Sequence, residues 1–500
     1  MNKVLLIIYL TFEVLNVNAQ KVNWQNLDLK KDGFLGISTD KAYNELLWDK
    51  KPTEVIVAVI DAGIDTLHED LKAKLWTDAA TGIHGWNYIG DEAGREDVTR
   101  LALQNAKKFA EYTYMQVPSA LQSAYEAHWE MTATLDAKTA NLKKFITDLV
   151  HIQQVLVGII KNIGKDDPSL MDFEAYQPKN EGEEKVLKPF LKRMGLYPDW
   201  KSFKSAEITA LLVKANYHLL HGLNRDNPEP GTARGDADVS PDKLGPFADP
   251  SWTPYHGTHV AGIIGADRGN NVGMKGIADH VKLMALKVNG NIRELRDEDL
   301  ASAIRFAVDH GAKVINMSFG KPYTWNKKVV DEAVKYAMQH DVLIVHAAGN
   351  SSQDNDHVPN YPSPFYEHSK RAAKAWLEVG ASDKRDDSTL VASFSNYGRR
   401  TVDVFAPGVD IYSTLPYYNQ YGFDSGTSMA TPVVAGLAAL IWEYYPRLSA
   451  IQVKDIIMKS VVKINHNVIV NKEKVPFNEL CVSGGIANAY KALQLAALYR

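Results

Sequence analysis

The chain has 500 residues, enough for two or three domains or for one large α/β domain with insertions. Hydrophobic residues make up 45% of it and charged residues 23%, the ordinary balance of a globular protein. The formal net charge of -4 gives no indication of a nucleic-acid partner, and none is expected. A single cysteine excludes an intramolecular disulfide, so stability must come from packing or bound ions.

The first 19 residues are predicted to be a cleaved signal peptide. Lys3 precedes an apolar run over residues 4–10, and small residues stand before a cleavage point after Ala19. We therefore expect a secreted or periplasmic protein. A short membrane anchor is the alternative, because Glu13 is unusual in a leader, but no other stretch approaches the length of a membrane span.

A buried strand is predicted over residues 54–61, after a short helix over residues 39–48. The strand's continuous β-branched run is typical of a parallel sheet covered on both faces. Asp61 ends the strand, and open α/β sheets place their sites at the carboxyl ends of strands. A turn aspartate before Gly63 is the alternative interpretation.

Residues 92–245 have few strand-like runs and a strong helical periodicity. Apolar residues recur at helical spacing over residues 142–163 until Gly164, and Pro118 suits the first turn of the helix. We interpret this block as an inserted α-helical subdomain whose apolar stripe forms its own core; a binding groove is the alternative. Two further helices are expected at residues 183–194 and 205–223.

Strands and helices alternate from residue 255 onward. This alternation predicts parallel βαβ units and therefore an α/β fold. The expected strands span residues 281–288, 313–317, 342–346, 377–381 and 402–405, and the expected helices span residues 255–265, 297–310, 326–340, 428–445 and 487–498.

Ser428 is the candidate nucleophile, within the segment GTSMATP at the start of an apolar, helix-forming run. The small residues leave its hydroxyl uncrowded, and a helix N-terminus favours a developing negative charge. A serine that only caps a core helix is the alternative. Because serine is a weak nucleophile alone, it needs a base and an orienting group. His256 can take the hydroxyl proton while Asp61 fixes the imidazole tautomer.

Three segments resemble the signatures of the subtilisin-like serine peptidases: VAVIDAGID around Asp61, HGTHVAG from His256, and GTSMATP around Ser428. The order of acid, base and nucleophile is the one known for subtilisin. The resemblance implies a subtilisin-like parallel sheet flanked by helices on both faces. It also implies a serine endopeptidase that hydrolyses polypeptide substrates through an acyl-enzyme on Ser428, with His256 as general base and acid.

The resemblance extends to a substrate-binding wall. Ser318, Phe319 and Gly320 match a family segment that borders the primary specificity pocket and pairs with the peptide as an added strand, with Phe319 in place of leucine. Ala348 and Gly349 are expected to contact substrate as well. Phe319 and the alanines at 347 and 348 favour a pocket for apolar side chains.

Asn350 matches the side-chain amide that, with the nucleophile's own backbone N–H, holds the oxyanion in this family. A turn asparagine after Gly349 is the alternative. His259 occupies the position of a structural histidine and receives no catalytic role. Asp70 and the loop over residues 269–273 resemble parts of the family's calcium site. No cofactor is needed for the chemistry, and a structural calcium ion is compatible with this partial match.

The chain departs from the family at two points. Asp61 and His256 stand 195 positions apart, where the family usually has a few dozen, so we expect the helical block to cap the cleft and restrict which chains enter. The segment between Ala19 and Asp61 is too short for the usual folded pro-domain. The expected organisation is a signal peptide (1–19), a first part of the catalytic domain (20–91), a helical insertion (92–245) and a second part of the catalytic domain (246–500).

Two other functions stay open. Some relatives with helical insertions shield the acyl-enzyme from water and act as transpeptidases or macrocyclases, so a transferase of the same fold is one alternative. The other is a non-catalytic, peptide-binding pseudopeptidase. The presence of Asp61, His256, Ser428 and Asn350 argues against this last possibility.

Overall fold

The computed structural model describes most of the chain between residues 22 and 499. The predicted signal peptide and both predicted ends of the helical insertion, near residues 92 and 245, lie outside the described residues. The described ranges are 22–88, 121–194, 199–209, 254–289, 295–369, 371–416 and 419–499, with single positions at 109, 117, 118, 212, 215 and 219.

A nine-stranded sheet forms the centre of the main body, in the order β10-β13-β7-β6-β5-β4-β1-β3-β2. Neighbouring strands are parallel except for β10, which runs antiparallel to β13 at one edge. The predicted parallel α/β fold is therefore confirmed. The strands are β1 (Val55–Asp61), β2 (Gly85–Asn87), β3 (Val281–Lys287), β4 (Val314–Met317), β5 (Leu343–Ala347), β6 (Trp376–Ser382), β7 (Val404–Pro407), β10 (Val462–Lys463) and β13 (Gly485–Ile486).

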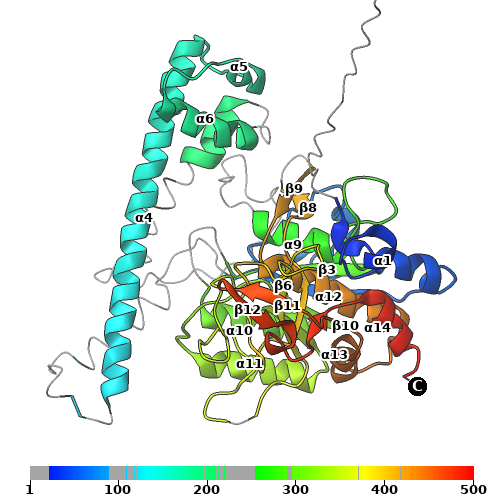
Figure 1. Ribbon diagram of the computed structural model, residues 1–500. Helices are drawn as coiled ribbons and strands as arrows, with labels where there is room; N and C mark the ends of the chain where they lie inside the picture. The colour runs from blue at the N-terminus through cyan, green and yellow to red at the C-terminus, as the bar shows by residue number, and fades with distance from the viewer. Residues whose placement is uncertain are drawn as a thin grey trace, which may run out of the picture.

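Helices cover both faces of the sheet (Figure 1). On β1, Val57 and Val59 face the core formed with α9, α12, α13 and α14, whereas Ala58 and Ile60 face the core formed with α10 and α11. Burial on both sides explains the unbroken apolar run, since each buried valine contributes about 1.5–3 kcal/mol. The helices are α9 (Tyr255–Gly265), α10 (Asp297–Asp309), α11 (Lys327–Gln339), α12 (Thr427–Tyr444), α13 (Ala450–Lys459) and α14 (Ala489–Ala496).

Several smaller elements differ from the sequence-based expectation. The helix expected over residues 39–48 is α2 (Thr39–Ala42) continued by a π-helix (Tyr43–Leu47). Two antiparallel hairpins were not predicted: β8 (Ile411–Leu415) with β9 (Gln420–Asp424), and β11 (Asn467–Val470) with β12 (Glu473–Pro476). The other short helices are α1 (Leu29–Asp32) and the 3-10 turns Trp24–Asn26, Lys72–Lys74 and Phe477–Glu479.

The helical subdomain stands beside the sheet, with α4 as its long cyan helix in Figure 1. Gly164 ends α4 at a φ of 76°, as the sequence predicts. Part of the apolar stripe builds a separate core, including Leu149 and Ile159, but Phe145 stays 40% exposed. The elements are α4 (Gln122–Ile163), α5 (Leu170–Glu174), α6 (Glu181–Met194), α7 (Trp200–Phe203) and a π-helix (Lys204–Thr209).

Candidate active site

Asp61 and His256 meet at the carboxyl edge of the sheet. Asp61 ends β1 with a side chain only 1% exposed, and His256 lies in the first turn of α9. The Nδ1 atom of His256 lies 2.8 Å from Oδ1 and 3.0 Å from Oδ2 of Asp61. Gly257 permits this approach, because a Cβ there would lie 2.0 Å from the carbonyl oxygen of Gly63. The pair therefore has the geometry in which a carboxylate orients an imidazole.

The electrostatic surroundings of His256 favour its charged form. Burial of the ring acts to lower its pKa, but the charge and hydrogen bond of Asp61 and the charge of Asp424 outweigh burial. The pKa of His256 is consequently raised above the ordinary value for histidine. Asp424 was not identified from the sequence, because a lone carboxylate at the end of a hairpin strand carries no recognisable signal.

Ser428 lies in the first turn of α12, which packs against both β1 and α9. Its Oγ donates a hydrogen bond to the carbonyl oxygen of Ser318 at 2.9 Å, and Oγ of Ser318 donates to the carbonyl oxygen of Ser428 at 2.9 Å. Among the described residues, Ser428 makes no hydrogen bond to His256. The hydroxyl must therefore turn about the Cα–Cβ bond to reach the imidazole, and such bonds often form only with substrate present.

Nδ2 of Asn350 and the backbone N–H of Ser428 border the same space beside Gly426. The backbone N and Oγ1 of Thr427 each donate to Oδ1 of Asn350 at 2.9 Å, which leaves Nδ2 of Asn350 directed away from them. A Cβ on Gly426 would lie 3.4 Å from that Nδ2 and 3.5 Å from the backbone N of Ser428. Because Gly426 has no Cβ, this space is open to an oxygen that carries negative charge. The orienting role of Thr427 was not predicted.

The expected substrate-binding segments follow two neighbouring strands. Ser318 directly follows β4, and Ala348 and Gly349 follow β5. Gly349 has a φ of 107°, a left-handed conformation that favours glycine. The ring of Phe319 packs against the core formed with α10 and α11. It therefore supports the segment over residues 318–320 from the side of that core.

His259 lies on α9 one turn after His256, and Asp70 contacts Tyr421 on β9 and Asn270. Burial holds the pKa of His259 well below its usual range, as befits a neutral, packed imidazole. Asp70 is fully buried; its Oδ2 accepts hydrogen bonds from Tyr421 Oη at 2.9 Å and from the backbone N of Met274 at 3.3 Å, and its Oδ1 contacts Nδ2 of Asn270. Within the described ranges, no cluster of three His, Cys, Asp or Glu residues could hold a metal. A single buried carboxylate beside an amide suits a hard cation in part.

The helical subdomain contacts the main body next to the candidate site. Nζ of Lys138 on α4 donates to Oη of Tyr323 at 2.8 Å, three positions after Gly320. The guanidinium of Arg193 on α6 lies 5.7 Å from the centre of the Tyr255 ring, and Tyr255 directly precedes His256. The subdomain thus reaches both the substrate-binding wall and the start of α9.

Comparison with known proteins identifies the family of the chain. The pattern of the subtilase family matches residues 53–480, and the chain belongs to this family. It is 42% identical over 199 residues to a thermophilic serine proteinase of Bacillus sp. strain AK1, covering 39% of this chain and 45% of that protein. It is 40% identical over 201 residues to subtilisin DY of Bacillus licheniformis, covering 40% of this chain and 68% of that one.

Among solved structures, a protease from Pseudoalteromonas arctica is 27% identical with a TM-score of 0.40, over 49% of this chain and 71% of that chain. Of the two curated relatives, the matched part of the chain spans less than half the length of the thermophilic proteinase and about two thirds of the length of subtilisin DY.

Proposed function

We propose that this protein is an exported serine endopeptidase that hydrolyses polypeptides through an acyl-enzyme on Ser428. Membership of the subtilase family supports a serine peptidase. The observation that carries the proposal is the contact of His256 with the buried Asp61, at 2.8 Å, beside a helix whose first turn contains Ser428. Export rests on the predicted leader; no helix among the described residues is long and apolar enough to cross a membrane.

In the proposed mechanism, the Ser428 hydroxyl turns toward His256 and attacks the scissile carbonyl carbon while the imidazole takes its proton. Nδ2 of Asn350 and the backbone N–H of Ser428 hold the oxyanion. When the C–N bond breaks, His256 gives its proton to the leaving amine. Water then attacks the ester with His256 again as base, which releases the second product and restores the serine. Asp61 holds the imidazole and stabilises its charged form throughout.

The substrate is proposed to pair along residues 318–320 as an added strand, with Ala348 and Gly349 facing it across the pocket. Product analysis by mass spectrometry separates hydrolysis from transfer by the same site. Hydrolysis of a defined peptide gives only fragments with free carboxylates. Joined or cyclic products as the main outcome would instead identify a transpeptidase or macrocyclase.

As the pH is lowered, kcat/KM is expected to fall, and this fall should begin at a higher pH than it would with a histidine of ordinary pKa. His256 must be neutral to act as a base, and its raised pKa means that protonation sets in at higher pH. Asp424→Asn removes one charge that raises this pKa, so the acid limb of kcat/KM should move to lower pH. The test is a pH profile of kcat/KM for both proteins; coincident acid limbs would exclude the influence of Asp424.

We further propose that the helical subdomain caps the cleft and excludes folded chains. The contacts of Lys138 and Arg193 next to the site support this role. The double variant Lys138→Ala/Arg193→Ala should raise cleavage of folded proteins relative to short peptides by about fivefold, because each contact is worth about 0.5–1 kcal/mol. Lys144→Ala, on the exposed side of α4, is the matched control. The capping role would be refuted if the ratio of folded-protein cleavage to peptide cleavage stayed unchanged both in the double variant and in a protein that lacks residues 92–245.

A structural calcium ion at Asp70 is also proposed, with Asn270 and carbonyl oxygens of its loop as further ligands. A chelator should then lower the melting temperature of the wild-type protein by several degrees, because a ligand that binds only the folded state stabilises it. Asp70→Asn should lower it without a chelator and abolish calcium binding in calorimetry. Asp49→Asn, at an exposed position of the main body, serves as control. A wild-type melting temperature that does not respond to calcium or chelator would contradict the proposal.

A further inference from the structure

One side of α4 carries a stripe of side chains that is only partly covered. The stripe consists of residues that lie within about 40° of one direction around the helix: Lys138, Leu142, Phe145, Leu149 and Ile152. Leu149 belongs to the core of the subdomain, but Phe145 is 40% exposed and Ile152 is 36% exposed. Two exposed apolar side chains, seven positions apart on the same side as buried Leu149, form a surface rather than isolated exposures.

The α4 stripe faces the main body. At one end, Nζ of Lys138 donates to Oη of Tyr323 at 2.8 Å. At the other end, Leu149 packs in one core with α6, which lies beside α4 (Figure 1). Arg193 of α6 in turn contacts the ring of Tyr255, directly before the candidate base. The stretch of α4 between these two contacts, about 16 Å long, therefore looks toward the candidate site.

The opposite side of α4 is polar. Lys144 points about 120° away from the stripe and forms an exposed ion pair with Asp148. A helix side that only meets solvent has this character. The apolar side chains of the stripe are thus a feature of the side that faces the main body.

The contact between α4 and the main body leaves room for one extended chain. Nζ of Lys138 lies 5.4 Å from the centre of the Tyr323 ring, so the lysine meets the hydroxyl end-on. Two long side chains that meet end to end hold their backbones apart by roughly the 10 Å at which an extended strand packs on a second layer. A helix placed between them would need about that distance on each of its sides. The spacing therefore favours an extended polypeptide over a second helix.

The expected path of the substrate leads to this space. Ser318 contacts Ser428 at 2.9 Å, so a chain that pairs along residues 318–320 moves away from the scissile bond as it approaches Gly320. Tyr323 is three positions further, at most about 10 Å along the chain. The part of the substrate on the acyl side of the scissile bond therefore leaves the wall beside Lys138, where the α4 stripe begins.

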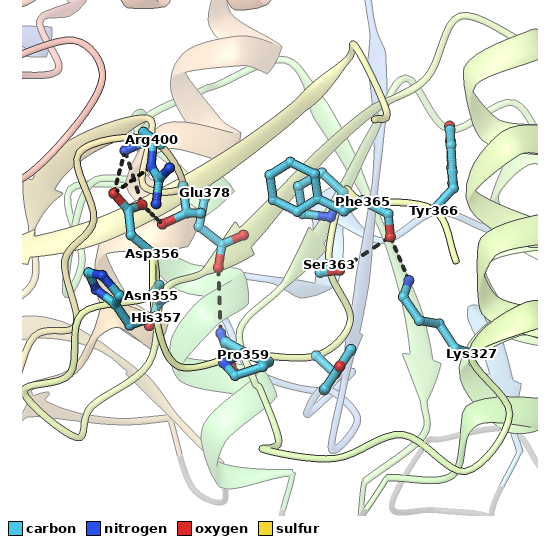
Figure 2. A pocket seen from close by; sticks show the side chains of 14 residues that line it. Lys327, Asn355, Asp356, His357, Pro359, Ser363, Phe365, Tyr366, Glu378 and Arg400 are labelled. Atoms are coloured by element: carbon cyan, nitrogen blue, oxygen red, sulfur yellow. Dashed lines mark hydrogen bonds and ion pairs between the residues drawn. The ribbon is translucent and has the colours of Figure 1, made fainter. Parts of the chain in front are cut away.

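Figure 2 shows a separate cavity of about 540 Å³ in the main body. Among the described residues, its lining includes none from α4 and none from the segment over residues 318–320. Its long cationic side chains already have partners: Arg400 lies 3.2 Å from Asp356, and Nζ of Lys327 donates to the carbonyl oxygen of Phe365 at 2.6 Å. The cavity is therefore not continuous with the wall, whereas the α4 stripe is.

We propose that the α4 stripe is an exosite, a surface away from the scissile bond that binds apolar side chains of an extended polypeptide substrate. The inference rests on the proposed function, because it assigns a second binding surface to the substrate of that same site. At about 3.3 Å per residue, the exosite meets residues roughly five to nine positions before the scissile bond. Every second side chain of an extended strand points to the same side, so alternate leucine or phenylalanine residues fit Phe145 and Ile152.

The test uses internally quenched peptides built on a sequence that the wild-type protein cleaves in a peptide library. One peptide has four residues before the scissile bond. The second adds a six-residue extension with leucine at alternate positions, and the third has serine at those positions. The wild-type protein should cleave the leucine-extended peptide with a kcat/KM about tenfold above both others, mainly through a lower KM, because binding buries apolar area.

The variants assign this advantage to the α4 stripe. Phe145→Ala/Ile152→Ala should reduce it to about twofold and leave the short peptide unchanged. Val157→Ala is the matched control, because Val157 is also exposed on α4 but points about 100° away from the stripe. Phe145→Lys should also weaken the leucine preference, and it should improve cleavage of a peptide with glutamate at the alternate positions about fivefold.

The outcomes separate two kinds of failure. If the wild-type protein cleaves no peptide of the library, the proposed peptidase function itself fails. If it cleaves all three peptides equally, or if the leucine advantage survives in the double variant, the exosite is overturned. The short peptide reports folding, and Phe145→Lys replaces a double variant that fails to cleave it. Faster cleavage of the short peptide by the double variant would assign the stripe to another segment of this chain, and a wild-type dimer that dissociates in the double variant would assign it to a second copy. Either result also overturns the proposal.

Discussion

Replacing Ser428 with alanine should abolish peptide hydrolysis. The variant lacks the attacking oxygen, and the loss of kcat should be roughly a million-fold, the order established for removal of the nucleophile in subtilisin. The kinetic measurement uses purified protein and an internally quenched peptide. Ser425→Ala, three positions earlier and just before α12, is the matched control and should keep the wild-type rate. Activity that survives in the Ser428 variant would refute the mechanism.

Asp61→Asn should lower kcat by about 10⁴, with little change in KM. In the wild-type protein, Nδ1 of His256 lies 2.8 Å from Oδ1 of Asp61. Asparagine has nearly the same shape as aspartate, but its neutral amide cannot stabilise the imidazolium and allows the wrong tautomer of the imidazole. Kinetics with the same peptide and a thermal melt would show loss of turnover in a folded protein.

Asp424→Asn is the matched control for Asp61→Asn. It also removes a carboxylate whose charge acts on His256, but one that makes no hydrogen bond to the ring. Its rate at the optimum pH should stay close to that of the wild type. Equal losses in the two variants would mean that general electrostatics, rather than orientation of the imidazole by Asp61, drives the reaction.

Buried regular elements could be predicted from the sequence because their apolar periodicity is imposed by the sheet. The strand expected over residues 54–61 is observed as Val55–Asp61, and the helix expected over residues 255–265 is observed with those bounds. Both elements are covered by core side chains on well-defined faces. Elements with half-exposed residues escaped prediction; β9 is half-buried along its whole length and shows no alternation.

The candidate site was predictable as a set of residues but not as an arrangement. Short motifs identified Asp61, His256, Ser428 and Asn350, since each motif combines small residues with one reactive group. The contacts that orient these groups join distant parts of the chain: Thr427 fixes the amide of Asn350, and Asn360 meets Gly320. Neither contact leaves a pattern in the sequence, because it depends on how β4, β5 and their loops lie together.

The measurement that tests the central claim most directly is active-site labelling of the folded wild-type protein with a fluorophosphonate, followed by mass spectrometry of the digested product. The account predicts one label per chain on Ser428, no labelling of protein that is denatured before the reagent is added, and strongly slowed labelling of Asp61→Asn. Absence of a label, or a label on another serine in protein that cleaves peptides, would contradict it.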